Sequence, residues 1–148
     1  MQFSKIILAS LLVLFPLGAY SQDWKTNLDE AKAIAQKENK NIILVFSGSD
    51  WCAPCIKLEK NIWASDTFKA EAKKDWVLVK ADFPKKKNNA QEENLKKQNA
   101  VLAEKYNKEG NFPLVVIMDK NGKVLGKTGF KNISPAEYIV QLHSFENK

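Results

Sequence analysis

Runs of apolar residues alternate with amphipathic segments along this chain, a pattern that predicts strands connected by helices. Residues 42–46 are continuously apolar and mostly β-branched, which is typical of a strand buried on both faces of a parallel sheet. Residues 77–82 and 114–118 predict two further strands. Residues 123–128 predict a fourth, paired antiparallel with the third across the turn-forming sequence 119–122.

Helices are predicted where apolar residues recur at helical spacing. Thr26 or Asn27 can cap the first helix, and Asp29 and Glu30 lie near the positive end of its dipole. Gly110 is expected to end the helix that precedes the third strand. The predicted helical segments are 27–39, 56–60, a stretch that begins at residue 66, 90–106 and 134–145.

The order of these elements predicts a single α/β domain. Strands that alternate with crossover helices form right-handed βαβ units with a parallel core, and the terminal hairpin adds antiparallel strands. We therefore expect a three-layer α/β/α sandwich around a mixed four-stranded sheet. No repeat or linker interrupts residues 22–148, and 148 residues leave room for one compact domain.

Residues 1–21 have the features of an export signal. Lys5 supplies a positive charge, residues 6–17 are mostly apolar, and Ala19 and Ser21 are the small residues that a signal peptidase reads. An apolar run of twelve residues that contains a proline is too short for a transmembrane anchor, which needs roughly 20. We expect cleavage after Ser21, no membrane span in the mature chain, and a periplasmic or extracellular location where disulfides persist.

All 23 basic residues are lysine, which argues against nucleic-acid binding because specific phosphate and base contacts favour the planar fork of arginine. The formal charge is +6, and most lysines are scattered as on a solvated surface. One cluster, residues 85–87, follows Pro84 in a sequence typical of an exposed loop. The sequence does not show whether this cluster attracts an acidic partner.

Cys52 and Cys55 are the most informative residues. A strand, a short break and then a helix place Cys52 at a helix N-terminus, where unpaired N–H groups and the helix dipole favour a thiolate. In such motifs the pKa of the first cysteine falls to between about 3.5 and 7.5. Cys55, one turn further on, is expected to be less exposed. Cys52 is then the nucleophile that attacks a partner disulfide, and Cys55 resolves the mixed disulfide.

Two other roles are open to the cysteine pair. A structural disulfide would close only a four-residue loop and contribute little entropic stabilisation. A metal site would need ligands beyond two cysteines, and His143, the only histidine, lies in the last predicted helix. We expect neither a metal nor another cofactor. The alternative function is a non-catalytic binding module with a structural disulfide.

Three segments together form a recognisable pattern. They are residues 46–55 with the Cys-Ala-Pro-Cys motif, Phe112-Pro113 at the start of a strand, and residues 119–123 at the hairpin. This pattern, which extends over residues 28–143, resembles the thioredoxin superfamily and specifically its exported thioredoxin-like proteins. Residues 55–60 and 66–68 further resemble the C-terminal thioredoxin-like domain of the bacterial membrane thiol-disulfide interchange protein.

The resemblance implies a substrate-binding surface beside the cysteines. Trp51 would flank the nucleophile and present an apolar face to partners, with a role in the core as the alternative. Pro113 matches the family's cis-proline, whose loop faces the cysteines and receives the backbone of a bound disulfide peptide. Phe112 departs from the smaller residue often found before this proline. With Pro54, these residues form the expected substrate-binding surface.

Proton transfer is where the chain departs from the resemblance. Thioredoxin has a buried acid six residues before the first cysteine, and this chain has Phe46 there, so the usual proton acceptor is absent. The resemblance implies that Glu59, four residues after Cys55, faces back towards the pair. The alternative is an exposed Glu59 paired with Lys60 or Lys57.

These features predict an exported thiol-disulfide oxidoreductase that reduces or isomerises protein disulfides. The motif lacks the histidine that stabilises a strongly oxidising thiolate, which favours the reducing direction. The expected partners are protein disulfide substrates and an electron donor that is either a membrane protein or thioredoxin-like. We expect a monomer.

Overall fold

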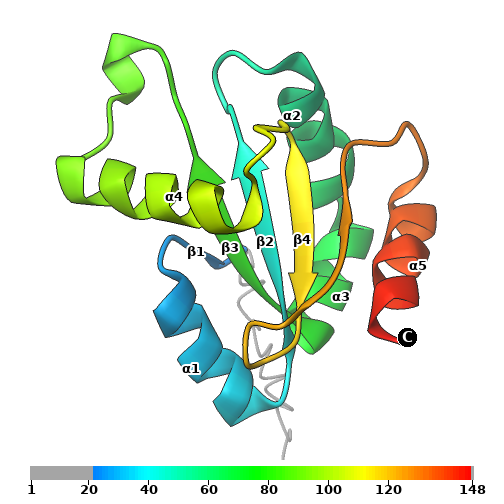
Figure 1. The fold of residues 1–148 in the computed structure, drawn as a ribbon. Coiled ribbons are helices and arrows are strands. Elements are labelled where there is room, and N and C mark those ends of the chain that lie inside the picture. Colours follow the sequence, from blue (N-terminus) through cyan, green and yellow to red (C-terminus); the bar gives the residue numbers. More distant parts are fainter. Residues whose placement is uncertain (1–21, 148) are drawn as a thin grey trace, which may run out of the picture.

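The computed structural model describes residues 22–147, so the predicted signal peptide lies outside the described residues. A five-stranded mixed sheet with the strand order β1-β3-β2-β4-β5 forms its centre, and helices cover both faces (Figure 1). The predicted three-layer α/β/α sandwich is confirmed. The strands are β1 (Trp24–Lys25), β2 (Asn41–Ser47), β3 (Trp76–Asp82), β4 (Leu114–Met118) and β5 (Val124–Thr128).

The prediction of four strands is wrong by one, because β1 adds a strand at the sheet edge. Its two residues, Trp24 and Lys25, pair in parallel with Leu78 and Val79 of β3. A strand this short has no alternation of apolar and polar residues to distinguish it from a loop. This segment is a strand because it pairs with the outer edge of β3, and that edge forms only when the sheet has folded.

The central strand β2 explains where the functional site forms. It pairs in parallel with β3, from Asn41 opposite Trp76 to Ser47 opposite Asp82. It also pairs antiparallel with β4, with Phe46 opposite Leu114. The carboxyl ends of β2 and β3 therefore lie beside the start of β4, at the same end of the central strands. Residues that follow β2 and β3, or precede β4, are brought together there.

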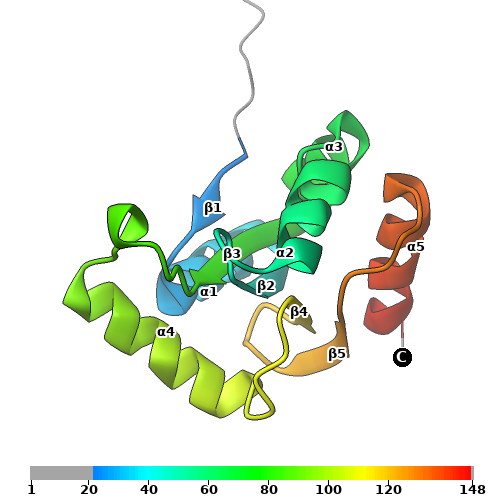
Figure 2. The same cartoon turned by 90° about the horizontal axis from the view of Figure 1, so that it is seen from above.

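Helices cover both faces of the sheet (Figure 2). Helices α1 (Leu28–Glu38) and α4 (Glu93–Tyr106) pack on the first face. Helices α2 (Ala53–Leu58), α3 (Asp66–Asp75) and α5 (Pro135–Glu146) pack on the second. Among residues 22–147, no helix is long and apolar enough to cross a membrane.

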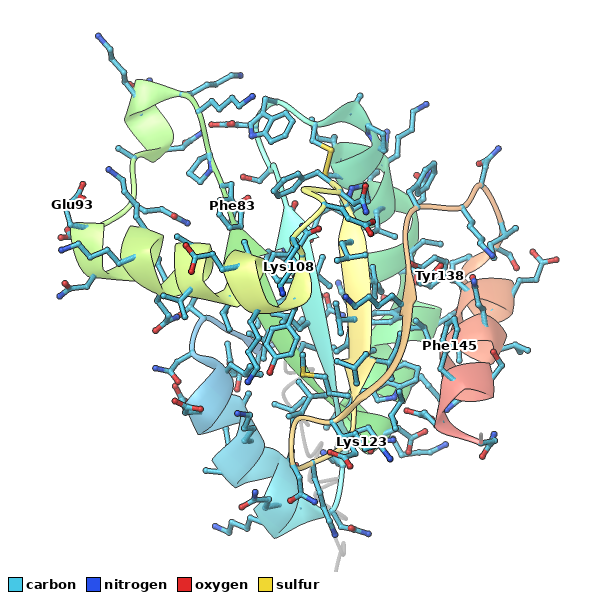
Figure 3. All side chains as sticks on the ribbon, in the orientation of Figure 1. Phe83, Glu93, Lys108, Lys123, Tyr138 and Phe145 are labelled. Carbon is cyan, nitrogen blue, oxygen red and sulfur yellow. A yellow bond between two sulfur atoms is a disulfide. The ribbon has the colours of Figure 1, made fainter. Side chains whose placement is uncertain are left out.

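The core is divided into two hydrophobic clusters by the sheet itself. On the α2–α3–α5 face, the ring of Trp63 is fully enclosed and contacts Phe68 at 4.5 Å and Tyr138 at 5.6 Å between centroids. Tyr138 and Phe145 point from α5 towards the sheet (Figure 3). Alternate residues of each central strand enter opposite clusters, as the period of two in a strand requires.

Local capping chemistry accounts for where the helices begin and end. The side chain of Asn27 accepts from two N–H groups at the start of α1, as predicted, and Ser134 with Glu137 forms a reciprocal capping box at the start of α5. Helix α4 is shorter than the predicted 90–106. It begins at Glu93, after a separate 3₁₀ turn η2 (Lys87–Asn89), and Asn107 rather than Gly110 follows its last residue.

Candidate active site

The cysteine motif lies on the turn that connects β2 to α2. Strand β2 ends at Ser47 and α2 begins at Ala53, so Cys52 is the N-cap residue of the helix. Between them, the Gly48 carbonyl oxygen accepts hydrogen bonds from the N–H groups of Trp51 at 3.2 Å and Cys52 at 2.9 Å. The predicted strand, break and helix around the motif are confirmed. A short π-helix, η1 (Glu59–Trp63), continues α2.

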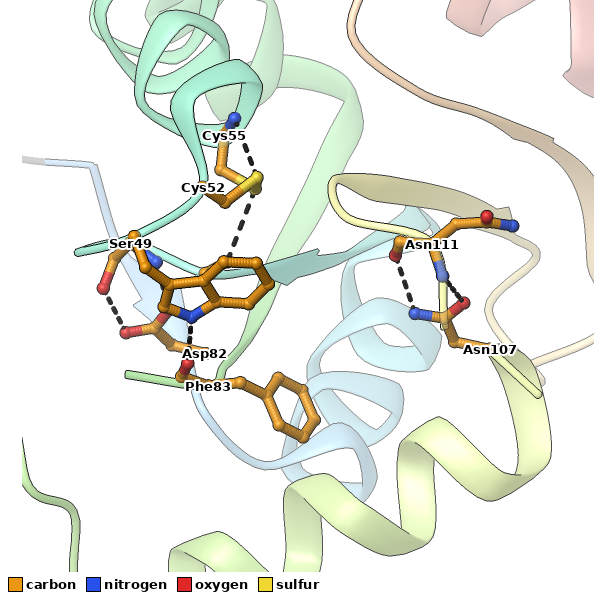
Figure 4. The surroundings of a disulfide bond; sticks show 9 residues. Ser49, Cys52, Cys55, Asp82, Phe83, Asn107 and Asn111 are labelled. Carbon is orange, nitrogen blue, oxygen red and sulfur yellow. Dashed lines mark hydrogen bonds between the residues drawn. A yellow bond between two sulfur atoms is a disulfide. The ribbon is translucent and has the colours of Figure 1, made fainter. Parts of the chain in front are cut away.

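Cys52 and Cys55 form a disulfide, with their Cα atoms 5.2 Å apart (Figure 4). The Cys55 N–H donates to Cys52 Sγ at 3.3 Å, and the Gly48 N–H donates to Cys55 Sγ at 3.4 Å. The two residues are 5% and 3% exposed, so the expected difference in exposure is small in the oxidised protein. Their hydrogen bonds do differ, because only Cys52 Sγ accepts from an N–H group in the first turn of the helix, that of Cys55.

Trp51 covers the motif on one side and is held by three neighbours. Its Nε1–H donates to the Phe83 carbonyl oxygen at 2.7 Å, and its ring meets Phe112 edge-on at 5.4 Å. A Cβ atom on Gly48 would lie 2.3 Å from the indole, so only glycine permits this contact. The residue is 39% exposed, which excludes a role in the core. Trp51 therefore presents a fixed apolar surface next to Cys52.

The segment that precedes β4 forms the opposite side of the site. The Phe112–Pro113 peptide bond is cis, as the family resemblance implies. Asn107 braces this segment, since its side chain both donates to the Asn111 carbonyl oxygen and accepts from the Asn111 N–H, each at 2.9 Å. A shallow groove of about 530 Å³ runs past Pro54, Phe112 and Pro113. The predicted substrate-binding residues are thus neighbours on one surface.

Aromatic rings fill the interior at this end of the sheet. Phe46 is fully buried and stacks on Phe83 at 6.4 Å, and Phe83 contacts Phe112 at 5.4 Å. No acid occupies the position of Phe46, as the sequence requires. The nearby Asp82 carboxylate accepts from both the N–H and the hydroxyl of Ser49, so it fixes the loop before the cysteines.

Lys57 lies near the end of α2, and Glu59 is the first residue of η1. The Glu59 carboxylate pairs with Lys80 of β3 at 2.7 Å, and neither Lys57 nor Lys60 is its partner. Lys80 Nζ also lies 4.6 Å from the centre of the Trp24 ring. Lys57 is exposed and forms no ion pair with a described residue. Glu59 is therefore tied to the sheet one helical turn beyond Cys55.

His143 lies away from the cysteines, between α3 and α5. Its Nδ1 is 2.6 Å from Glu146 and its Nε2 is 2.8 Å from Glu71, with Asp75 at 3.6 Å. Partial burial lowers the pKa of His143, but the hydrogen bonds to Glu146 and Glu71 outweigh burial and raise it above its usual value. His143 thus connects α5 to α3 through its hydrogen bond with Glu71.

Several residues of the site were not predicted. Phe83 supplies the acceptor for the Trp51 indole, Asp82 fixes Ser49, and Asn107 braces the segment before Pro113. Phe83 and Asp82 are at the end of β3, whose carboxyl end meets that of β2. The rule that functional loops follow parallel strands was the available signal for them. Asn107 directly follows α4, whose end at Tyr106 was predicted, but the sequence carries no signal that its side chain bonds to Asn111.

Comparison with known proteins gives one consistent result. A family model described as thioredoxin-like matches residues 23–120. The Disulfide bond reductase DsbH of Chlamydia pneumoniae is 36% identical over 129 residues, which cover 87% of this chain and 75% of that protein. The Thioredoxin-related protein DsbJ of the same organism is 26% identical over 132 residues, which cover 83% of this chain and 37% of DsbJ.

Solved structures show the same likeness. A structure described as DsbH Oxidoreductase superposes with a TM-score of 0.78 at 34% identity and covers 96% of this chain and 94% of that one. A thioredoxin from Thermus thermophilus superposes with a TM-score of 0.61 at 16% identity, covering 84% and 87% of the two chains. The second likeness concerns the fold alone.

Proposed function

Since this chain belongs to the thioredoxin-like family and is a thiol-disulfide oxidoreductase, we propose that its dithiol form reduces disulfides in exported partner proteins. The observation that carries the proposal is the position of Cys52 Sγ at the start of α2, where it accepts the Cys55 N–H beside the exposed Trp51. The name of the 36% identical relative, a disulfide bond reductase, supports the reducing direction.

The reaction consists of two exchanges of sulfur partners. The Cys52 thiolate attacks one sulfur of the partner disulfide, which forms a mixed disulfide and releases the other partner sulfur as a thiolate that takes up a proton. The Cys55 thiol then loses its proton and attacks Cys52 Sγ, which releases the second partner thiol and closes the Cys52–Cys55 bond. Two electrons pass from the dithiol to the partner.

The N–H groups at the start of α2 favour the first step. The Cys55 N–H donates to Cys52 Sγ, and the partial positive charge of the helix end stabilises a thiolate more than a thiol. Cys55 Sγ instead accepts the Gly48 N–H, which lies in the turn before the helix. We assign Cys52 as the nucleophile and Cys55 as the resolving residue on this difference.

The groove beside Pro113 is proposed to hold the partner backbone during exchange. It passes Pro54 of the motif and Phe112, and the Trp51 ring lies against Phe112. An extended peptide in this groove would have its disulfide next to Cys52. Trp51, Pro54, Phe112 and Pro113 are therefore the proposed substrate-binding residues, with apolar contact as their main contribution.

Several finer aspects of the activity are also proposals. Glu59 is proposed to accept the proton of Cys55, with Lys57 as a further nearby charge on the same helix. The protein is proposed to work as a monomer in the periplasm or outside the cell, after removal of residues 1–21. A membrane or thioredoxin-like donor would return two electrons to the disulfide after each turnover.

The reduction potential of the cysteine pair tests the direction. We expect a value near about −270 mV when the protein is equilibrated against graded thiol-disulfide buffers, whereas a protein-oxidising enzyme would have about −120 mV. A bond that stays closed well below about −300 mV would mark a structural disulfide and a non-catalytic binding module.

Two cysteine variants test the assignment of roles. Cys55→Ser should accumulate a mixed disulfide with a model disulfide peptide, because Cys52 can attack but nothing resolves the product. Cys52→Ser should form no such adduct and reduce no substrate. Mass spectrometry of the trapped protein distinguishes the two, and reduction by Cys52→Ser at the rate of the unchanged protein would contradict the mechanism.

A further inference from the structure

The loop that follows β3 is fastened to the loop that carries the cysteine motif. We call residues 84–89 the basic loop. The Asp50 carboxylate accepts hydrogen bonds from the N–H groups of Lys85 and Lys86 and from Asn89 Nδ2, each at 2.9 Å. These bonds, with that from Asn89 contributing most, hold the pKa of Asp50 below its usual value, so the carboxylate stays charged. One acidic side chain thus fixes both loops relative to each other.

The fastened loop carries positive charge to the edge of the active site. Lys85 Nζ lies 3.8 Å from the centre of the Trp51 ring, and Trp51 immediately precedes Cys52. Lys85, Lys86 and Lys87 are exposed, and none of them forms an ion pair within residues 22–147. Asp50 offsets one of these three charges. A net positive charge therefore remains beside the nucleophile, in a position set by hydrogen bonds.

A second groove, of about 330 Å³, lies against the basic loop. Phe83, Pro84 and Ala90 give it an apolar lining, and the three lysines of the loop form its basic part together with Lys96 of α4. Lys96 is already paired with Glu93 at 2.7 Å, so the loop lysines supply the available charge. The Phe83 carbonyl oxygen also accepts the Trp51 indole N–H, so this groove lies next to the site.

We propose that the basic loop and its groove bind an acidic segment of the partner protein, located next to the disulfide that Cys52 attacks. The inference rests on the proposed function and adds a class of partner to it. Carboxylates would pair with the lysine ammonium groups, and the aliphatic parts of the same segment would contact Phe83 and Pro84. Nucleic acids and anionic membranes also attract lysine, but only a polypeptide carries the disulfide with which Cys52 reacts.

The charges would act mainly on the rate of association. Opposite charges on two proteins steer their encounter, and salt screens this attraction over distances of about 10 Å at 0.1 M ionic strength. The sulfur exchange itself would be unchanged, with two electrons passing from the Cys52–Cys55 dithiol to the peptide disulfide and both peptide thiols released. The second-order rate constant is therefore the quantity that should respond.

Three peptides with the same disulfide test the inference. The residues that flank the cysteines are glutamate, glutamine or lysine, and release of peptide thiols by the reduced protein is followed at about 20 mM and about 500 mM NaCl. Each rate constant is divided by that of dithiothreitol with the same peptide, which removes the effect of flanking charge on disulfide reactivity. At low salt we expect the glutamate peptide to react roughly tenfold faster than the glutamine peptide, with the difference lost at high salt.

Two triple variants with the same change in net charge locate the effect. Lys85→Gln, Lys86→Gln and Lys87→Gln together should abolish the preference for the glutamate peptide over the glutamine peptide at low salt. The matched control replaces three exposed lysines of other segments with glutamine and should retain the preference. The control positions are Lys37, Lys108 and Lys123.

The outcomes separate this inference from the proposed function. If the reduced protein reduces all three peptides at equal rates, the function stands and the acidic partner is wrong. If the control variant loses as much preference as the loop variant, net charge rather than the basic loop is responsible, and the inference is again overturned. If the protein reduces none of the peptides while dithiothreitol does, the proposed function itself fails.

Discussion

The indole of Trp51 joins the cysteine motif to segments that are far away in the sequence. Its N–H reaches the Phe83 carbonyl oxygen after β3, and its ring contacts Phe112 before β4 and Gly48 after β2. A ring with an apolar body and one donor suits this place, because it can contact a partner and still satisfy its N–H.

Gly48→Ala should displace this ring. The new Cβ atom would lie 2.3 Å from the indole, so Trp51 must move and lose its hydrogen bond to Phe83, at a cost of about 0.5 to 1.5 kcal/mol in the free energy of unfolding. Peptide disulfide reduction should also slow. Denaturant unfolding and peptide reduction rates measure both effects. In a Trp51→Ala background the same substitution should cost little, because the obstacle is gone.

Glu59→Gln tests the proposed proton transfer at the second cysteine. We expect Cys52 to attack at its normal rate, while release of the mixed disulfide by Cys55 slows several-fold because no carboxylate accepts the Cys55 proton. Rapid-quench mass spectrometry separates the two steps. The matched control is Glu104→Gln on the exposed side of α4. Equal slowing of both steps would instead indicate that the Glu59–Lys80 ion pair only positions the helix.

Among the elements, helices α3 and α5 meet through a cluster of titratable side chains. Glu71 and Asp75 face His143 from α3, where Lys74 pairs with both of them, and Glu146 faces it from α5 itself. The hydrogen bond from His143 lowers the pKa of Glu71, whereas burial raises the pKa of Asp75. Most of the charges around His143 are thus negative, and its protonated form is favoured in the folded protein.

The contact between α3 and α5 should weaken as the pH rises. The pKa of His143 is raised above the unfolded value of 6.5, so its contribution to stability is fully present below that pH and is lost as the pH rises through the folded pKa. His143→Gln should therefore lower the free energy of unfolding more at about pH 6 than at about pH 9. Urea titrations at both pH values measure this difference, and an equal effect at both would contradict it.

Elements could be predicted from sequence where the local signal was strong. Strand β4 has the predicted bounds because its five apolar residues lie between Pro113 and Asp119, both of which interrupt the pattern. The start of α4 was placed three residues too early because residues 90–92, which connect the 3₁₀ turn to the helix, contain no glycine or proline that would mark them as outside it. Strand β1 depends on pairing with β3 and could not be found locally.

The residues of the candidate site divide in the same way, into those with a local sequence signal and those that depend on distant segments. Cys52, Cys55 and Trp51 are consecutive features of one motif, and a local pattern was enough to place them. Phe83 and Asp50 matter only because β2 and β3 are parallel and in register, so their loops meet in space. A phenylalanine or an aspartate in the sequence does not by itself indicate that the loops after β2 and β3 meet. Contacts between loops of different strands are fixed by the whole sheet.

At the scale of the whole molecule, the two hydrophobic clusters share a single sheet and should unfold together. Leu142→Ala removes a fully buried side chain of α5 and should cost about 2 to 5 kcal/mol. Val140→Ala on the same helix removes one that is 69% exposed and should change stability by about 0.5 kcal/mol or less. Far- and near-ultraviolet circular dichroism should report one common transition in both variants, and separate transitions would contradict this coupling.

The hydrogen bonds from Asp50 fix the backbone of the basic loop largely independently of which side chains the loop carries. Two of its three partners are backbone N–H groups, which every residue type except proline provides. The side chains at positions 85 and 86 can therefore vary during evolution without releasing the loop. Substitutions at these surface positions can therefore change which partner proteins are bound, while the thiol-disulfide exchange at the adjacent cysteines stays the same.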